Sequence, residues 1–164
     1  MNYRQFFEFV ASHIVGYKRV MKTWIIVAGA SSAQLFETEN KGADLKKIRE
    51  FDHPQSRKKT KDLTTDRPGR SFDSMGLGRH AEERGDPHFH EQTVFAQQLI
   101  LFLNKARTNN EFDNLIIVAA PTFLGELRQS MSNPLKKCVT KEVNKDLAAW
   151  VGKKDLKERI TELL

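Results

Sequence analysis

The side chains whose types and spacing most suggest chemistry lie in the segment 54–90. It holds three of the five histidines and four of the nine glycines, but no valine or isoleucine. A guanidinium group is a planar fork of donors that matches the oxygens of a phosphate. The candidate phosphate-binding residues of the segment are Arg67, Arg70 and Arg79, with Lys58 and Lys59 upstream of them. The segment therefore predicts contacts to phosphate groups.

Three glycines and a histidine lie among these arginines. Gly69, Gly76 and Gly78 allow backbone shapes and close approaches that a Cβ atom would block, and His80 can titrate near neutral pH. With the arginines, they favour a contact to RNA. A solvated surface loop is the alternative, because eight Lys/Arg residues of the segment face six Asp/Glu residues. The chain contains no dinucleotide fingerprint, Walker A sequence or DNA-binding motif, so we expect no cofactor.

A second pattern of histidines lies at the end of the segment. His88 and His90 are two residues apart and have carboxylates beside them, which is compatible with a divalent metal. Their spacing fits no established metal motif, and Glu91 suits the first turn of a helix, where a carboxylate is favoured. We therefore expect a helix entry and no metal site, with His80, His88 and His90 as the alternative metal ligands.

Composition limits the class of protein. The chain has 164 residues, 39% of them hydrophobic and one of them cysteine, which fits one domain without a disulfide framework. Its net charge of +6 and pI near 9.5 favour anionic partners such as RNA or the ribosome. No apolar run is long enough for a membrane span, and the N-terminus lacks a signal-peptide pattern. We expect a cytoplasmic protein, with a surface or secreted location as the alternative.

Several elements must position the segment 54–90. Residues 1–20 read as an N-terminal extension, either an amphipathic helix or a start assigned upstream of Met21. Three strand-like runs follow at 23–28, 33–39 and 44–52, joined by short turns, which predicts an antiparallel meander. The first run is a continuous β-branched and aromatic run, as expected of a central strand covered on both faces.

The residues after the segment alternate between helix and strand patterns. Apolar spacing predicts an amphipathic helix over 91–107 and a buried strand within 113–120. Pro121 fits the start of a second helix, and Asn133 fits the N-cap of a third. A last strand over 139–147 has Val139 and Val143 on one face, and a helix closes the chain. The sequence predicts a single α/β domain over 21–164, with a mixed β-sheet flanked by helices and a long loop at 54–90.

Ordered motifs along the chain also resemble a known family. The motifs are Lys22–Ala28, Asp66–Ser71, Gly78–His80, Asp86–His88, Ala119–Arg128 and Glu142–Leu147. In this order they resemble the bacterial host attachment protein family, named for attachment of bacteria to host cells. The resemblance covers about Met21 to Leu164, and it implies a host-cell surface as one partner.

That family is similar to the central domain of archaeal and eukaryotic class-one release factors and of ribosome-rescue factors. The resemblance implies a mixed sheet flanked by helices and a partner in RNA or the ribosome. In release factors a Gly-Gly-Gln loop helps water to cleave peptidyl-tRNA, whereas this chain has Gly76-Leu77-Gly78-Arg79. The expected function is therefore non-enzymatic RNA or ribosome binding through 54–90. The alternatives are a host-cell adhesion factor and a peptidyl-tRNA or metal-dependent hydrolase.

Overall fold

A single five-stranded sheet organises the chain. The computed structural model describes residues 5, 20–39, 44–57 and 87–164. Across the sheet the strands follow the order β3-β2-β1-β4-β5. Their bounds are β1 Thr23–Ala28, β2 Ser32–Thr38, β3 Lys46–Asp52, β4 Asn114–Ala119 and β5 Val139–Asn144.

The pairing of the strands is mixed. The first three strands form an antiparallel meander, and β1 pairs with β4, and β4 with β5, in parallel. Side chains of β1 alternate between two cores, since Trp24 and Ile26 belong to one buried cluster and Ile25 to the other. These pairings confirm the predicted α/β fold, its mixed sheet and its central strand buried on both faces.

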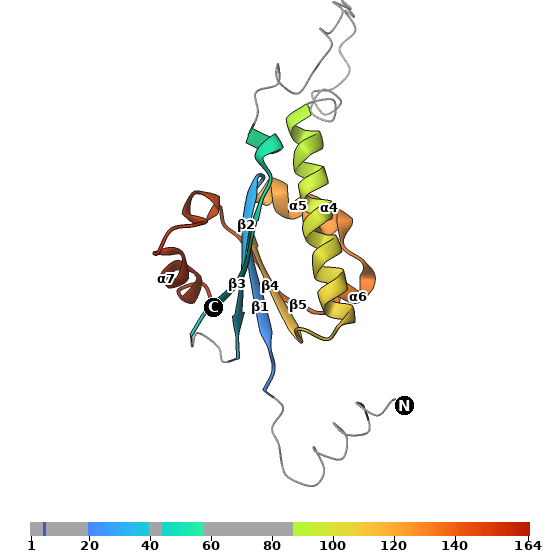
Figure 1. Cartoon of the computed structure of the whole chain (residues 1–164), viewed down its shortest axis with the longest axis vertical. Coiled ribbons are helices and arrows are strands. Elements are labelled where there is room, and N and C mark those ends of the chain that lie inside the picture. The colour runs from blue at the N-terminus through green and yellow to red at the C-terminus, as the bar shows by residue number, and fades with distance from the viewer. Residues whose placement is uncertain (1–4, 6–19, 40–43, 58–86) are drawn as a thin grey trace, which may run out of the picture.

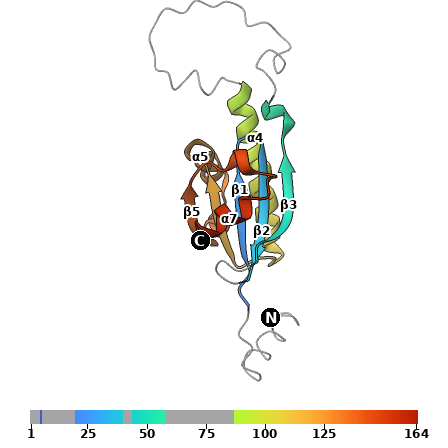
Figure 2. The same ribbon diagram turned by 90° about the vertical axis from the view of Figure 1, so that its left-hand side faces the viewer.

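Helices cover the two faces of the sheet unequally (Figure 1). The long helix α4 packs on one face with α5 and α6, and the short α7 lies on the other. The bounds are η1 Pro54–Arg57, α4 Pro87–Thr108, α5 Pro121–Ser130, α6 Asn133–Lys136, η2 Ala148–Trp150 and α7 Leu156–Thr161. Figure 2, turned by 90°, shows α7 lying across the strands.

Stacked aromatic rings fill the core beneath α4. The ring of Trp24 on β1 stacks on Phe112 with centroids 4.8 Å apart and on Phe102 at 6.2 Å. The Trp24 indole N–H donates to Glu37 Oε2 over 3.1 Å, so its polar edge is satisfied. At the edge of this core, the Arg49 guanidinium lies 4.9 Å from the Phe102 ring centroid. These contacts fix α4 against the meander.

Both ends of the predicted loop 54–90 are helical. Residues 54–57 form η1, and α4 begins at Pro87, four residues before the predicted start at Glu91. A proline fits the first position of a helix because its missing N–H needs no partner there. Glu91 therefore lies beyond the first turn, which contains no acidic residue. The expectation that Glu91 supports the helix N-terminus is wrong.

Two further local expectations are also wrong. Ser132, not Asn133, caps α6, because the Ser132 hydroxyl accepts the backbone N–H of Leu135 over 3.4 Å. On β5, Val139 packs against the core on the α4 side, whereas Val143 packs against the core on the α7 side. The reason is a register shift in the pairing of β4 with β5, which passes over Thr140 and reverses the alternation after it.

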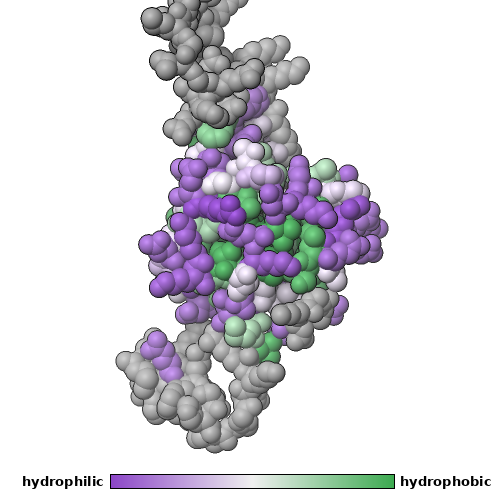
Figure 3. Space-filling view, turned by 180° about the vertical axis from the view of Figure 1, so that it is seen from behind, coloured by the Kyte–Doolittle hydropathy of each residue, from purple (hydrophilic) through white to green (hydrophobic). Residues whose placement is uncertain are grey.

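Charged side chains frame the β5 edge of the sheet. Figure 3 views this edge from behind and shows hydrophobic side chains surrounded by hydrophilic ones. Arg128 on α5 donates from Nε to Glu142 on β5 over 2.8 Å, and this hydrogen bond raises the pKa of Arg128. Charges on an edge strand discourage pairing with strands of other molecules. The charged residues on β5 therefore disfavour the addition of a further strand at this edge.

The predicted N-terminal extension 1–20 lies almost entirely outside the described residues, which include only its Gln5 and Val20. Its separation from the domain 21–164 stays a prediction. Within the described part of the chain, no helix combines the length and the apolar character needed to cross a bilayer.

Candidate functional site

A buried histidine lies between β3 and η1, the last described element before the segment 58–86. His53 follows the last residue of β3 and is 7% exposed. Its backbone N–H donates to the Ser31 carbonyl over 2.8 Å, which ties this position to the sheet. Its ring stacks on Phe95 of α4 with centroids 5.3 Å apart. His53 thus joins the end of the meander to α4.

Polar groups lie on both sides of the His53 ring. Nδ1 is 2.9 Å from Ser56 Oγ on η1, within hydrogen-bond distance. Nε2 is 3.6 Å from Glu91 Oε2 on α4, which is ion-pair distance if the ring is protonated. We call His53, Ser56, Glu91 and Phe95 the His53 clamp. It holds η1 against the N-terminal half of α4.

The residue types of the clamp also occur in nucleophilic triads, but its geometry differs from a triad. A triad needs hydrogen bonds on both sides of the imidazole, one to the nucleophile and one to the orienting carboxylate. The contact of 3.6 Å from Nε2 to Glu91 is too long for that bond. The His53 clamp therefore has a structural role, which is to hold η1 against α4.

The clamp fixes both flanks of the segment 58–86 at one end of the domain. η1 ends at Arg57 and α4 begins at Pro87. Figures 1 and 2 both show η1 and the start of α4 side by side at the top of the molecule. Arg57 and Pro87, the described residues on either side of the segment 58–86, therefore lie at the same end of the domain.

Most of the sequence-predicted site lies outside the described residues. This applies to Lys58, Lys59, Arg67, Gly69, Arg70, Gly76, Gly78, Arg79 and His80. Their roles in binding stay predictions. Of the predicted residues, His88 and His90 are described, and both lie in the first turn of α4, with His88 partly buried and His90 exposed.

The structure does not bring these two histidines into a metal site with other described residues. Within 20–39, 44–57 and 87–164, no group of three or more histidine, cysteine, aspartate or glutamate side chains is placed to hold a metal ion. The third member of the alternative set, His80, lies outside those ranges.

Sequence reasoning missed the two buried polar residues around which the described site is built. One is His53, and its signal was its place between the end of a strand and Pro54, three residues before Ser56. The other is Glu126, which lies between the buried Phe123 and Leu127 of α5 and is only 8% exposed. A carboxylate inside an apolar helical stripe is a signal, because burying a charge is costly unless something compensates for it.

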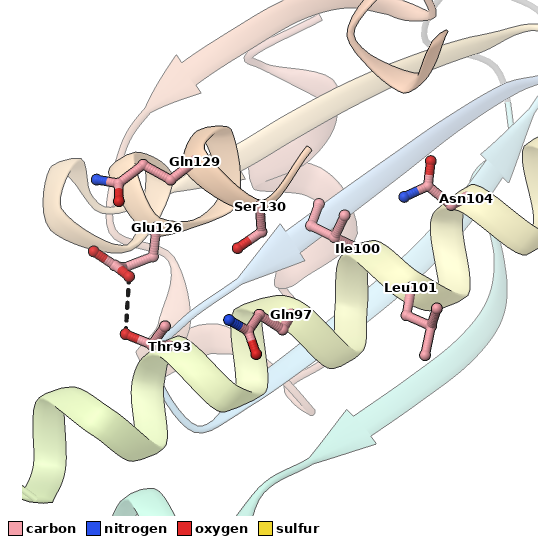
Figure 4. Close-up of a pocket in the computed structure, with 8 residues that line it drawn as sticks. All are labelled: Thr93, Gln97, Ile100, Leu101, Asn104, Glu126, Gln129 and Ser130. Atoms are coloured by element: carbon pink, nitrogen blue, oxygen red, sulfur yellow. Dashed lines mark hydrogen bonds between the residues drawn. The ribbon is translucent and has the colours of Figure 1, made fainter. Parts of the chain in front are cut away.

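Glu126 faces a groove between α4 and α5. The groove has a volume of about 440 Å³, and its first lining residue, Thr93, lies between Glu91 and Phe95 of the His53 clamp along α4. Figure 4 shows Thr93 of α4 and Glu126 of α5 pointing toward one another, with the hydrogen bond between them. The described domain thus carries two polar features on the α4 side, the His53 clamp and this groove.

Solved structures with a similar arrangement include two archaeal proteins. An archaeal translation termination factor, aRF1, matches 94% of this chain and 40% of its own length, with a TM-score of 0.45 and 12% identity. A second structure, described only as an archaeal protein, matches 94% of this chain and 39% of its own, with a TM-score of 0.43 and 14% identity. At such scores, no activity or partner transfers to this chain.

The amino-acid sequence of the chain is also similar to part of a bacterial protein. An uncharacterized protein of Rickettsia prowazekii (strain Madrid E) is 44% identical over 59 residues, which are 35% of this chain and 39% of that protein. The aligned region thus spans about two fifths of the relative's length.

A family model gives a longer match, from residue 24 to residue 160. This range contains every strand except the first residue of β1, and it extends into α7. The chain belongs to the family described as protein required for attachment to host cells.

Proposed function

We propose that this member of the host attachment family is a non-enzymatic RNA-binding protein that contacts RNA, free or in the ribosome, through the basic segment 54–90, with the contacts made by its residues 58–86. The phosphate-binding residues in this proposal are Lys58, Lys59, Arg67, Arg70 and Arg79. His80 adds a donor that depends on pH, and Gly69, Gly76 and Gly78 allow close approach of the backbone.

The observation that supports the proposal is the His53 clamp. It brings the flanks of the segment together on one end of the domain, beside η1 and the start of α4. Closing the ends of a loop limits the conformations it can adopt, so less entropy is lost when the loop is ordered on a ligand. A basic segment anchored in this way suits an extended, charged ligand.

Charge supports the same partner. The chain has 27 Lys/Arg against 21 Asp/Glu residues, a net charge of +6. A protein that neutralises phosphates releases counterions, so its affinity for RNA falls as the salt concentration rises. Arginine also stacks on bases, which gives contacts that a lysine-rich surface lacks.

The test is binding of purified protein to labelled single-stranded RNA and to ribosomes at several salt concentrations. The variant Arg67→Ala/Arg70→Ala/Arg79→Ala should bind RNA at least tenfold more weakly. Its plot of log affinity against log salt should be shallower by about two, at about 0.7 per lost phosphate contact. The control Lys136→Ala/Lys137→Ala/Lys154→Ala removes the same charge from exposed positions elsewhere and should bind like the wild type.

Equal losses in the two triple variants would contradict the proposal, because net charge alone would then explain the binding. The same preparations can be tested for release of the peptide from peptidyl-tRNA. Cleavage by the wild type that is lost in the arginine variant would favour the hydrolase alternative over simple binding.

The description of the family supports a second candidate, a factor that binds host cells directly. This candidate requires the protein at the cell surface, whereas an RNA-binding protein is expected in the cytoplasm. Fractionation of native cells distinguishes the two. Protein found wholly in the cytosolic fraction, together with no binding of purified protein to host cells, would contradict a direct adhesin.

A further inference from the structure

The groove between α4 and α5 is lined by two rows of mostly polar residues, one from each helix. On α4 the lining residues recur at helical spacing, so they share one face of the helix. On α5 the second and third lining residues lie three and four residues after the first, so all three are about one helical turn apart. The lining consists of Thr93, Gln97, Ile100, Leu101 and Asn104 on α4, and Glu126, Gln129 and Ser130 on α5. Its volume of about 440 Å³ is large enough for a side chain of a partner.

Glu126 is the only charged residue of this lining, and it is 8% exposed. The Thr93 hydroxyl donates to Glu126 Oε2 over 2.9 Å. The same oxygen of Thr93 lies 3.1 Å from the Phe89 carbonyl. Because a hydroxyl has one proton, these two acceptors compete for it. The carboxylate is therefore only partly compensated by its neighbour (Figure 4).

A cation that would compensate for this charge is missing from the described part of the chain. The ion pairs among the described residues join Lys47 to Glu50, His53 to Glu91 and Arg128 to Glu142. Within 20–39, 44–57 and 87–164, none involves Glu126. A buried carboxylate without a positive partner is costly, and a cation placed beside it recovers part of that cost.

The remaining lining selects the type of ligand. It includes the amides of Gln97, Asn104 and Gln129 and no lysine, arginine or histidine. Amide oxygens accept hydrogen bonds from N–H groups, and the carboxylate repels phosphate. A single carboxylate is a poor site for a divalent metal, which needs several oxygen ligands. The chemistry therefore favours an ammonium or guanidinium group.

An exposed leucine beside the polar lining indicates that the cation is carried on an apolar stem. Leu101 is 73% exposed, and it lines the groove one helical turn after Gln97. Lysine and arginine bury their methylene stems against apolar surface while the charged head reaches a polar group. A small inorganic cation would make no use of this side chain.

We propose that the α4–α5 groove binds a lysine or arginine side chain presented by a basic segment of a partner protein. The charged head lies against Glu126, the amides of Gln97 and Gln129 accept its remaining N–H groups, and its stem runs along the groove toward Leu101. This site differs from the RNA-binding segment in location and in charge, so the two proposals can fail separately.

The test uses an isotope-labelled full-length chain and two synthetic peptides, followed by NMR. One peptide is acetyl-Gly-Ser-Leu-Arg-Leu-Ser-Gly amide, and the other carries citrulline, which is neutral and nearly isosteric, in place of arginine. The arginine peptide should shift the amide signals of residues 93–104 and 126–130, and the citrulline peptide should not. Equal shifts with both peptides, or no shifts with either, would overturn the proposal.

Variants then test the role of the carboxylate. Glu126→Gln keeps the shape and should weaken binding of the arginine peptide at least tenfold, while Glu162→Gln, at an exposed position, should leave it unchanged. The free Glu126→Gln protein should melt at the same or a higher temperature, because a buried charge has been removed. Unchanged peptide affinity in this variant would contradict the assignment of Glu126.

Gln97→Arg gives a test that does not alter a buried residue. Gln97 is exposed, and an arginine there places a positive charge at the rim of the groove. It should weaken binding of the arginine peptide as Glu126→Gln does. Both variants should bind RNA like the wild type, because the groove lies apart from the segment proposed to bind RNA. A groove variant that loses peptide binding and keeps RNA binding would show that the two sites are separate. Unaltered peptide binding by Gln97→Arg would count against the proposal.

Discussion

The two faces of the sheet are covered in different ways. On one face, α4 lies along the strands, and its Leu99 and Leu103 are fully buried in a continuous core with α5 and α6. On the other face, a smaller buried cluster is closed by Leu147 and by Leu156 and Ile160 of α7. α4 has 22 residues, whereas α7 has 6. The first face is therefore covered by a long layer of packed helices, and the second by one short helix.

Polar and cation–aromatic contacts also hold the second cover. The Arg159 guanidinium lies 3.6 Å from the centroid of the Trp150 ring, and Lys153 lies 5.0 Å from it. The Lys141 ammonium donates to the carbonyl of Leu163 near the C-terminus. The cation–aromatic contacts contribute about 0.5 to 2 kcal/mol each. The comparison indicates that the α4 face sets the stability of the fold and the α7 face adds less to it.

The largest expected effect tests this difference directly. Leu99→Ala should lower the free energy of unfolding by about 4 kcal/mol, because the cavity lies in a layer that cannot collapse. Leu156→Ala, at a position 1% exposed, should cost about 2 kcal/mol, because the short α7 can shift toward the space. Urea unfolding followed by circular dichroism measures both. An equal loss in the two variants would mean that the faces are equally rigid.

A close backbone approach tests how tightly the second cover is fitted. A Cβ atom built on Gly29 would lie 2.4 Å from the Cβ of Ala148 in η2. Gly29→Ala should therefore cost about 1 to 3 kcal/mol, since overpacking forces the neighbour to move. Adding Ala148→Gly should recover part of this loss, and the coupling is read from a double-mutant cycle. Simple additivity of the two changes would show that they do not meet in the folded protein.

Much of this fold was predictable because its signals are local. The run Thr23–Ala28 is apolar on both faces, and the helical spacing of Leu99 and Leu103 gives α4 its buried side. The reversal on β5 was not predictable, because it depends on how β4 pairs with it after Leu115. The start of α4 at Pro87 was obscured by the neighbouring glycine and histidines, although a first-turn proline is a known helix signal.

The candidate site was less predictable than the fold. The basic segment attracts attention because its residue types are unusual, yet the described polar features depend on long-range contacts. Glu126 meets Thr93, which lies 33 residues earlier, and His53 meets Glu91 across η1 and α4. Sequence spacing gives no distance between such pairs, so only the folded arrangement identifies the His53 clamp and the groove.

The smallest expected effect concerns a polar contact at the sheet edge on β3. A hydrogen bond from Lys47 lowers the pKa of Glu50, and a second one from Gln34, 3.1 Å long, acts in the same direction. A carboxyl whose pKa is lower in the folded state stabilises the protein above its unfolded pKa, and this contribution is lost as the pH falls through the folded pKa. Glu50→Gln should therefore reduce stability near pH 7 by a few tenths of a kcal/mol, since Glu50 is exposed.

The pH dependence decides whether this small loss is electrostatic. The difference in unfolding free energy between the wild type and Glu50→Gln should shrink as the pH is lowered from 6 to about 3, the range where a carboxyl with a lowered pKa takes up its proton. High salt at pH 7 should also reduce it, because exposed charges are screened. A difference that stays constant over this pH range would show that Glu50 contributes through packing of its side chain. The polar edge would then resemble the α4 face, where shape and burial set the stability.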